Sequence, residues 1–102
     1  MAKIIVTEPL IRAAMKGARY KSQQPGGVSL PVIQRFVDRL QAGQTPPPIK
    51  IDNNMIVEGN HRYIAGRIVG KEPPIQNWAG GRPQDYISWD SIPIDPKDWG
   101  NT

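Results

Sequence analysis

Residues 49–70 read IKIDNNMIVEGNHRYIAGRIVG, and this stretch decides the fold. Two short apolar runs, Ile49 to Ile51 and Met55 to Val57, are rich in the residue types that favour strands. Asp52-Asn53-Asn54 joins them, and these residues tolerate the positive φ angles of hairpin turns. The pattern predicts an antiparallel β-hairpin.

The hairpin leads through a glycine into a helix. Glu58-Gly59-Asn60 breaks the second strand, and the apolar residues that follow recur at helical spacing. Gly70 is of the residue type that favours the end of a helix. We therefore expect a helix from about His61 to Val69, with Asn60 as its N-cap.

Two further helices are expected upstream. Thr7-Glu8-Pro9 provides an N-cap followed by an acidic residue and Pro in the first turn. A helix that continues through Arg19 should begin there, after a short strand from Ile4 to Thr7. Ser29 can cap another helix from Leu30 to Leu40, because the apolar residues of that segment share one face.

The remaining segments are short. Residues 21–27 show neither helical nor strand periodicity and are interpreted as an exposed, mobile loop. We expect a strand from Ile75 to Trp78 and an acidic tail over residues 79–102. Trp78, Trp89 and Trp99 are expected to be packing anchors for this tail. We expect one α+β domain over residues 1–102, with a small mixed sheet and about three helices.

Charge is divided unevenly along the chain. Residues 1–71 hold 11 Lys/Arg against 4 Asp/Glu, whereas residues 72–102 hold 2 against 5. A basic body of this kind attracts phosphate-rich ligands, DNA or RNA, or an acidic protein partner. Arg12, Lys16 and Arg19 recur on one face of the first expected helix and form a candidate nucleic-acid patch, with a solvated helix face as the alternative.

Several function classes are excluded by composition. The chain has no cysteine, which rules out disulfides, thiolate metal sites and cysteine nucleophiles and suits a reducing cytoplasm. No apolar run approaches the roughly 18 residues that span a bilayer, so no membrane partner is expected. No dense carboxylate cluster indicates a resident metal site, and Mg²⁺ is expected only in company with a bound nucleotide.

The turn from strand to helix carries the chemistry. The first N–H groups of a helix lack intrahelical partners and attract anions, and Gly59 lets a ligand approach the backbone. Arg62 in the first turn adds a planar fork for phosphate oxygens, and His61 adds a donor that could move a proton. Glu58 is the nearest carboxylate, and Asn60 completes the candidate phosphate-binding turn.

Each of these residues also has a purely structural interpretation. His61 lies on the apolar side of the expected helix and could be a hydrogen-bonded core histidine. Arg62 could instead form an ion pair with Glu58.

Gly59-Asn60-His61-Arg62-Tyr63 resembles the turn of the ParB/sulfiredoxin superfamily, whose members place Gly-x-His-Arg or Gly-Glu-Arg-Arg between a strand and a helix. The resemblance covers residues 30–78, including Pro48-Ile49-Lys50-Ile51. It implies a ParB/sulfiredoxin-like fold in which Gly59, Asn60, His61 and Arg62, with Lys50, contact the phosphates of ATP or CTP. Sulfiredoxins carry a nucleophilic Cys where Asn60 stands, so sulfinic-acid reduction is not implied here.

The resemblance and the charge together suggest a function. ParB proteins carry a downstream Glu-Asn-x-x-Arg motif and a helix-turn-helix domain that this chain lacks, so it is more similar to the small ParB-like toxin domains of secreted bacterial effectors. We expect a toxin-type nuclease or nucleotide triphosphate hydrolase, with His61 or Glu58 moving the proton. It would act in a cytoplasm, as part of a larger secreted protein if it is an effector, and an acidic immunity protein would be a partner. The alternatives are a non-catalytic nucleotide-binding switch and a DNA-binding module of ParB type.

Overall fold

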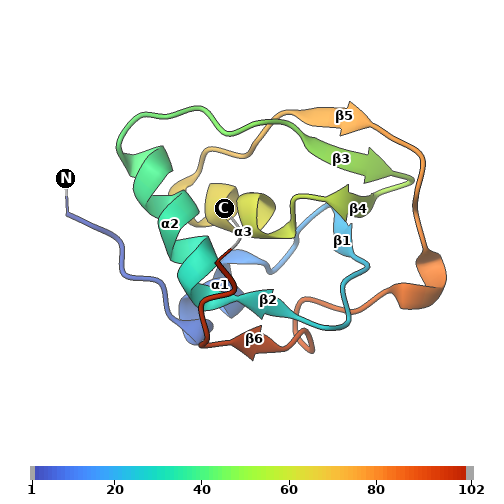
Figure 1. Cartoon of the computed structure of the whole chain (residues 1–102), viewed down its shortest axis with the longest axis horizontal. Coiled ribbons are helices and arrows are strands. Elements are labelled where there is room, and N and C mark those ends of the chain that lie inside the picture. The colour runs from blue at the N-terminus through green and yellow to red at the C-terminus, as the bar shows by residue number, and fades with distance from the viewer. Residues whose placement is uncertain (1, 101–102) are drawn as a thin grey trace.

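A computed structural model describes residues 2–100 and has the α+β architecture expected from the sequence (Figure 1). The three helices are α1 (Glu8–Ala14), α2 (Leu30–Gln41) and α3 (Asn60–Val69). The strands are β1 (Lys21–Ser22), β2 (Val28–Ser29), β3 (Ile49–Asp52), β4 (Met55–Glu58), β5 (Ile75–Asn77) and β6 (Ile94–Asp95). None of these helices is long and apolar enough to cross a membrane.

The predicted hairpin and helix form the centre of the molecule. β3 and β4 pair antiparallel, and Asn53 and Asn54 adopt φ angles of 48° and 67° in the turn between them. β5 and β1 add in parallel on the outer sides, which gives a mixed four-stranded sheet in the order β1-β4-β3-β5. β2 and β6 form a separate two-stranded parallel sheet.

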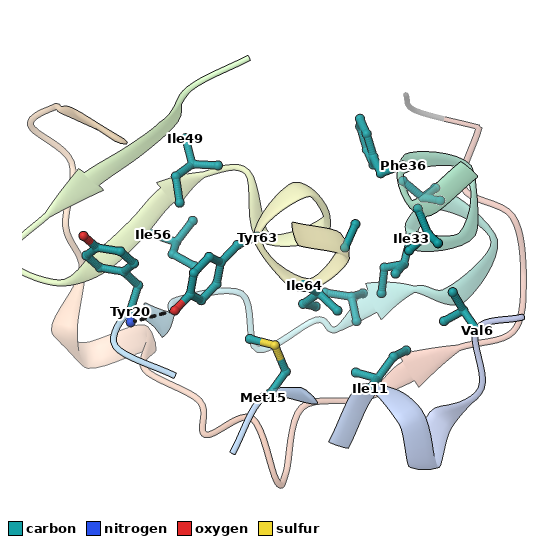
Figure 2. Close-up of a cluster of buried hydrophobic side chains, with 14 of the residues drawn as sticks. Val6, Ile11, Met15, Tyr20, Ile33, Phe36, Ile49, Ile56, Tyr63 and Ile64 are labelled. Carbon is teal, nitrogen blue, oxygen red and sulfur yellow. Dashed lines mark hydrogen bonds between the residues drawn. The ribbon is translucent and has the colours of Figure 1, made fainter. Parts of the chain in front are cut away.

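The core lies between the sheet and the helices, with α3 at its centre (Figure 2). Tyr63 and Ile64 of α3 are fully buried, and α2 packs its apolar face against this helix. The Tyr63 hydroxyl accepts a hydrogen bond from the backbone N–H of Tyr20, at 3.3 Å. Because α3 is held on several sides, its first turn has a fixed position relative to the rest of the chain.

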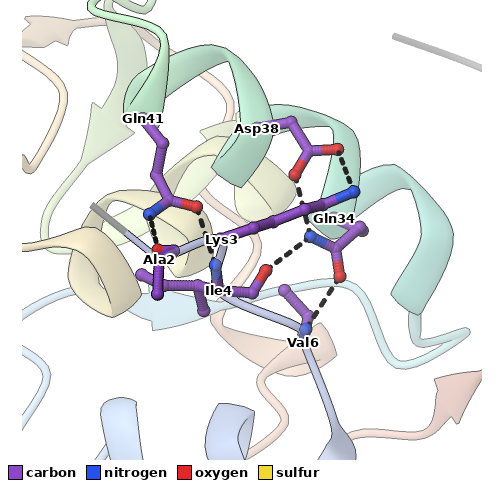
Figure 3. Close-up of polar contacts among 7 residues, drawn as sticks. All are labelled: Ala2, Lys3, Ile4, Val6, Gln34, Asp38 and Gln41. Atoms are coloured by element: carbon purple, nitrogen blue, oxygen red, sulfur yellow. Dashed lines mark hydrogen bonds and ion pairs between the residues drawn. The ribbon is translucent and has the colours of Figure 1, made fainter.

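The expected strand from Ile4 to Thr7 is absent, although Thr7 caps α1 as predicted. Residues 2–6 instead run along α2 and bond to glutamine side chains of that helix (Figure 3). Gln34 accepts from the N–H of Val6 at 2.7 Å and donates to the carbonyl of Ile4 at 2.9 Å. The backbone groups of this extended segment form hydrogen bonds with side chains and not with another strand. Local strand propensity does not indicate such bonds.

We predict that Gln34→Ala loosens this N-terminal segment. The change leaves two backbone groups without partners and should lower the free energy of unfolding by about 1–2 kcal/mol. Hydrogen exchange at the Val6 amide should become faster than in the wild type. Gln44→Ala, at an exposed position beyond α2, is the matched control. An unchanged exchange rate at Val6 would contradict the anchoring role.

The candidate nucleic-acid patch does not form on one helix, because α1 ends at Ala14 with Met15 as its C-cap. Lys16 and Arg19 lie after that end, so the three cations do not continue along one helical face. Arg12 donates to the carbonyl of Trp89 at 2.7 Å, and Arg19 lies over the Tyr20 ring. The expected helix through Arg19 is therefore wrong in its length.

The expectation that residues 21–27 form an exposed, mobile loop is also wrong. Lys21–Ser22 is a strand, and the side chain of Gln23 is buried. Gln23 donates to the carbonyl of Gly80 at 3.0 Å and accepts from the N–H of Arg82 at 2.6 Å. A polar sequence without periodicity is ordered here because its partners come from the distant tail.

The acidic tail packs against the rest of the molecule. Ile92 is fully buried, and Trp89 packs against Tyr63 and donates to the carbonyl of Tyr20 at 2.9 Å. The packing role expected for the Trp residues is confirmed for Trp89, whereas the side chain of Trp78 is 47% exposed. At Trp99 the tail lies beside the first turns of α2 and α3, where it contributes to the site described next.

Candidate functional site

The turn at Gly59 has a backbone that only glycine suits. Its φ is 113°, and a Cβ built at this position would lie 2.5 Å from Cγ2 of Ile49. The pairing register of β4 shifts just before the turn, where Val57 is the extra residue of a bulge between Ile51 and Lys50. The bulge and the glycine together turn the chain sharply from β4 into α3.

The first turn of α3 presents backbone donors. The first intrahelical bond runs from the N–H of Tyr63 to the carbonyl of Gly59, at 2.9 Å. The N–H groups of Asn60, His61 and Arg62 precede it and have no acceptor one turn back within the helix. Aligned peptide dipoles add a partial positive charge at this end of the helix. This is an arrangement that favours an anion.

A cavity of about 510 Å³ opens over this turn. Pockets that bind small molecules commonly enclose about 300–1,000 Å³. One wall is the segment from Val57 to Arg62, a second is the loop around Gln24, and the third comes from α2 and the tail through Val32, Phe36 and Trp99. The sequence predicts the first wall only.

His61 lines the cavity as a neutral imidazole. Its Nε2 accepts a hydrogen bond from the backbone N–H of Ser29 at 2.9 Å, so the ring proton must lie on Nδ1. Burial, reinforced by the positive charges of Arg35 and Arg62, lowers the pKa of His61 from 6.5 to about 4. His61 is thus a hydrogen-bonded core histidine, which agrees with the structural interpretation of its sequence position. It also borders the cavity.

Arg62, Glu58 and Lys50 form a row of charges at the rim. Arg62 donates to the carbonyl of Pro48 at 3.0 Å. It also forms the ion pair with Glu58 that its structural interpretation predicted, at 3.7 Å. Lys50 lies 3.6 Å from the same carboxylate, and its ammonium group is 4.3 Å from the centre of the Trp78 ring. Glu58 therefore contacts two cations at the rim of the cavity.

Asn60 is not the N-cap of α3, because the helix begins one residue earlier than expected. Gly59 is the N-cap, and it has no side chain with which to cap. Asn60 is the first helical residue, and its side chain donates to Gln24 at 3.3 Å. The Asn60 side chain is 4% exposed and lines the cavity.

The tail builds a wall that the sequence alone does not predict. Trp99 lies edge-on to His61 with 5.6 Å between the ring centres, and its backbone N–H donates to Oγ of Ser29 at 3.4 Å. Asp98 forms an ion pair with Arg35 at 2.5 Å. The only sequence signal for Trp99 is an aromatic residue in a short acidic tail, and a packing role explains that signal equally well.

The other candidate residues lie apart from this cavity or form no cluster. Arg12, Lys16 and Arg19 are not among the residues that line it, and Lys50 only approaches its rim through Glu58. Across residues 2–100 there is no group of three His, Asp or Glu side chains placed to hold a metal ion.

Comparison with known proteins adds no further constraint, since no family model, no curated protein and no solved structure matches this chain.

Proposed function

We propose that this chain binds a nucleotide through its phosphate groups at the first turn of α3. The observation that carries the proposal is that residues with three kinds of donor line one cavity. The donors are the free N–H groups of the helix start, the Arg62 guanidinium and the neutral imidazole of His61. The resemblance of residues 59–63 to a phosphate-binding turn of the ParB/sulfiredoxin superfamily supports the same ligand.

The charge balance of the cavity suits an anionic ligand. Arg62 already spans the carbonyl of Pro48 and the carboxylate of Glu58, and the Glu58 contact at 3.7 Å is long. A phosphate oxygen can replace that long contact with a shorter charge-assisted bond. Mg²⁺ would arrive with the nucleotide and would be held mainly by phosphate oxygens and water.

The contacts of His61 favour nucleotide binding over nucleotide hydrolysis as the function of this cavity. The lone pair of His61 Nε2 already accepts the Ser29 N–H, and Nδ1 carries the proton, so the neutral ring has no free position for an incoming proton. One observation still favours hydrolysis as the second candidate function: Glu58 lines the same cavity, and its side chain is 59% exposed. In that alternative Glu58 orients the attacking water and the helix start stabilises the developing charge.

Calorimetric titration with ATP, CTP and inorganic triphosphate, with and without Mg²⁺, tests the proposal. We predict that Arg62→Ala weakens binding at least about tenfold, because a charge-assisted bond to phosphate is lost. Arg67→Ala is a matched control on the same helix, since Arg67 also donates to a backbone carbonyl and pairs with a glutamate. Equal affinities for the two variants, or no binding by the wild type, would refute the proposal.

The same samples decide between binding and turnover. Release of phosphate from ATP or CTP, or cleavage of DNA or RNA, that is lost in Glu58→Gln would establish the hydrolase alternative. A toxin would in addition arrest growth when the wild-type chain is expressed in a bacterial cytoplasm, and Arg62→Ala would relieve that arrest. Tight binding without turnover favours a nucleotide-dependent switch.

A further inference from the structure

The side-chain amide of Asn60 has a fixed orientation. Gln24 donates from Nε2 to the carbonyl of Gly27 at 2.6 Å, and a carbonyl oxygen can only accept. Gln24 must therefore turn its Oε1 toward Asn60, and it accepts from Asn60 Nδ2 at 3.3 Å. This chain of bonds leaves Oδ1, and not Nδ2, as the unused atom of the Asn60 amide.

Oδ1 of Asn60 is buried without a hydrogen-bond partner among the described residues. An acceptor in this state carries a free-energy cost, and nearly all buried polar groups in folded proteins have partners. Asn60 lines the same cavity as the free N–H groups of α3. The missing partner is a hydrogen-bond donor, and a phosphate oxygen at neutral pH is an acceptor that cannot supply it.

The N–H group of Asn60 belongs to the helix start that would hold the phosphate, and the unpaired Oδ1 is on the same residue. The group that donates to Oδ1 must therefore lie close to the phosphate. Within the nucleotide itself, the hydroxyl groups of the sugar are the donors nearest to the phosphate chain. Apolar and aromatic side chains, among them Phe36 and Trp99, also line the cavity. A flat base can rest against such a wall, since aromatic side chains stack on bases without reading their identity.

We propose that the ligand of this cavity is a ribonucleotide, one of whose ribose hydroxyls donates to Oδ1 of Asn60. The inference rests on the proposed function and deepens it, because it separates nucleotides from other phosphates and ribose from deoxyribose. Asn60 acts as a specificity-determining residue, and Gln24 acts through it as a positioning residue.

Titration of the wild-type chain with ATP, 2′-deoxy-ATP, 3′-deoxy-ATP and inorganic triphosphate tests the proposal without any variant. At least one deoxy analogue should bind about five- to tenfold more weakly than ATP, since one hydrogen bond is lost. Asn60→Ala should bind ATP as weakly as the wild type binds that analogue, and it should no longer distinguish the two. Asn77→Ala, at an exposed position on β5, is the control and should keep the wild-type preference.

The possible outcomes separate the two proposals. If ATP and both deoxy analogues bind the wild type equally well, the ribose contact is refuted and phosphate binding stands. The same holds if Asn60→Ala, checked for folding by its thermal melt, keeps the wild-type preference. If neither ATP nor triphosphate binds at all, the proposed function fails, and the ribose contact fails with it.

Discussion

Gly59→Ala should lower the free energy of unfolding by about 3 kcal/mol or more, which combines left-handed backbone strain with overpacking. The backbone has a φ of 113°, and the new methyl group would meet the side chain of Ile49, a core residue of β3 that is fully buried. A shift of either β3 or the first turn of α3 would also displace the three free N–H groups. Phosphate affinity should therefore fall together with stability.

Urea denaturation measures this effect, and Gly70→Ala provides a matched control at the other end of the same helix. Gly70 also has a positive φ, at 85°, but a Cβ there would meet no atom within 4 Å. Its substitution should cost only the backbone strain, about 1 kcal/mol. If the two variants unfold at the same urea concentration, steric contact with Ile49 does not constrain the turn.

Acid should destabilise the protein through protonation of His61, at a higher pH than that at which the carboxyl groups titrate. The pKa of His61 is about 4 in the folded chain, against 6.5 ordinarily, so the unfolded chain binds a proton first as the pH falls. Stability should be constant above pH 6.5 and should decrease between about pH 6.5 and 4. The shift corresponds to a loss of about 3 kcal/mol when complete.

Urea denaturation as a function of pH tests this prediction, with His61→Gln as the comparison. Glutamine can still accept from the N–H of Ser29 but does not titrate, so its stability should vary much less between pH 6.5 and 4. The carboxyl groups of Asp95 and Asp98 also have lowered pKa values, through their bonds to Trp99 and Arg35. Their contribution is lost only below their ordinary value of 3.8, outside the His61 range. The same pH dependence in both proteins would show that His61 is not its cause.

The sequence predicts the elements whose partners are local. The hairpin and α3 follow from Asn53-Asn54, Gly59 and Gly70, because each of these residues acts on the backbone at its own position. The candidate turn could be located for the same reason, and with it the wall of the cavity from Glu58 to Arg62.

The errors arise where a partner is distant in sequence. Ile4 to Thr7 has strand propensity, but glutamines of α2 satisfy its backbone. Gln23 belongs to a polar segment that becomes ordered only when residues 80–82 reach it. The tautomer of His61 depends on the N–H of Ser29, 32 residues away, and no local pattern indicates that bond.

The path of the tail determines how the chain can be extended for experiments. Trp99 lies against His61 and lines the cavity, so a tag that follows this segment would be attached close to the cavity. The start of the chain lies elsewhere, because Gln41 at the last turn of α2 holds the carbonyl of Ala2. The 12 residues of α2 separate that point from Ser29 by about 18 Å. An affinity tag or fluorophore therefore belongs at the N-terminus, where it leaves the cavity open.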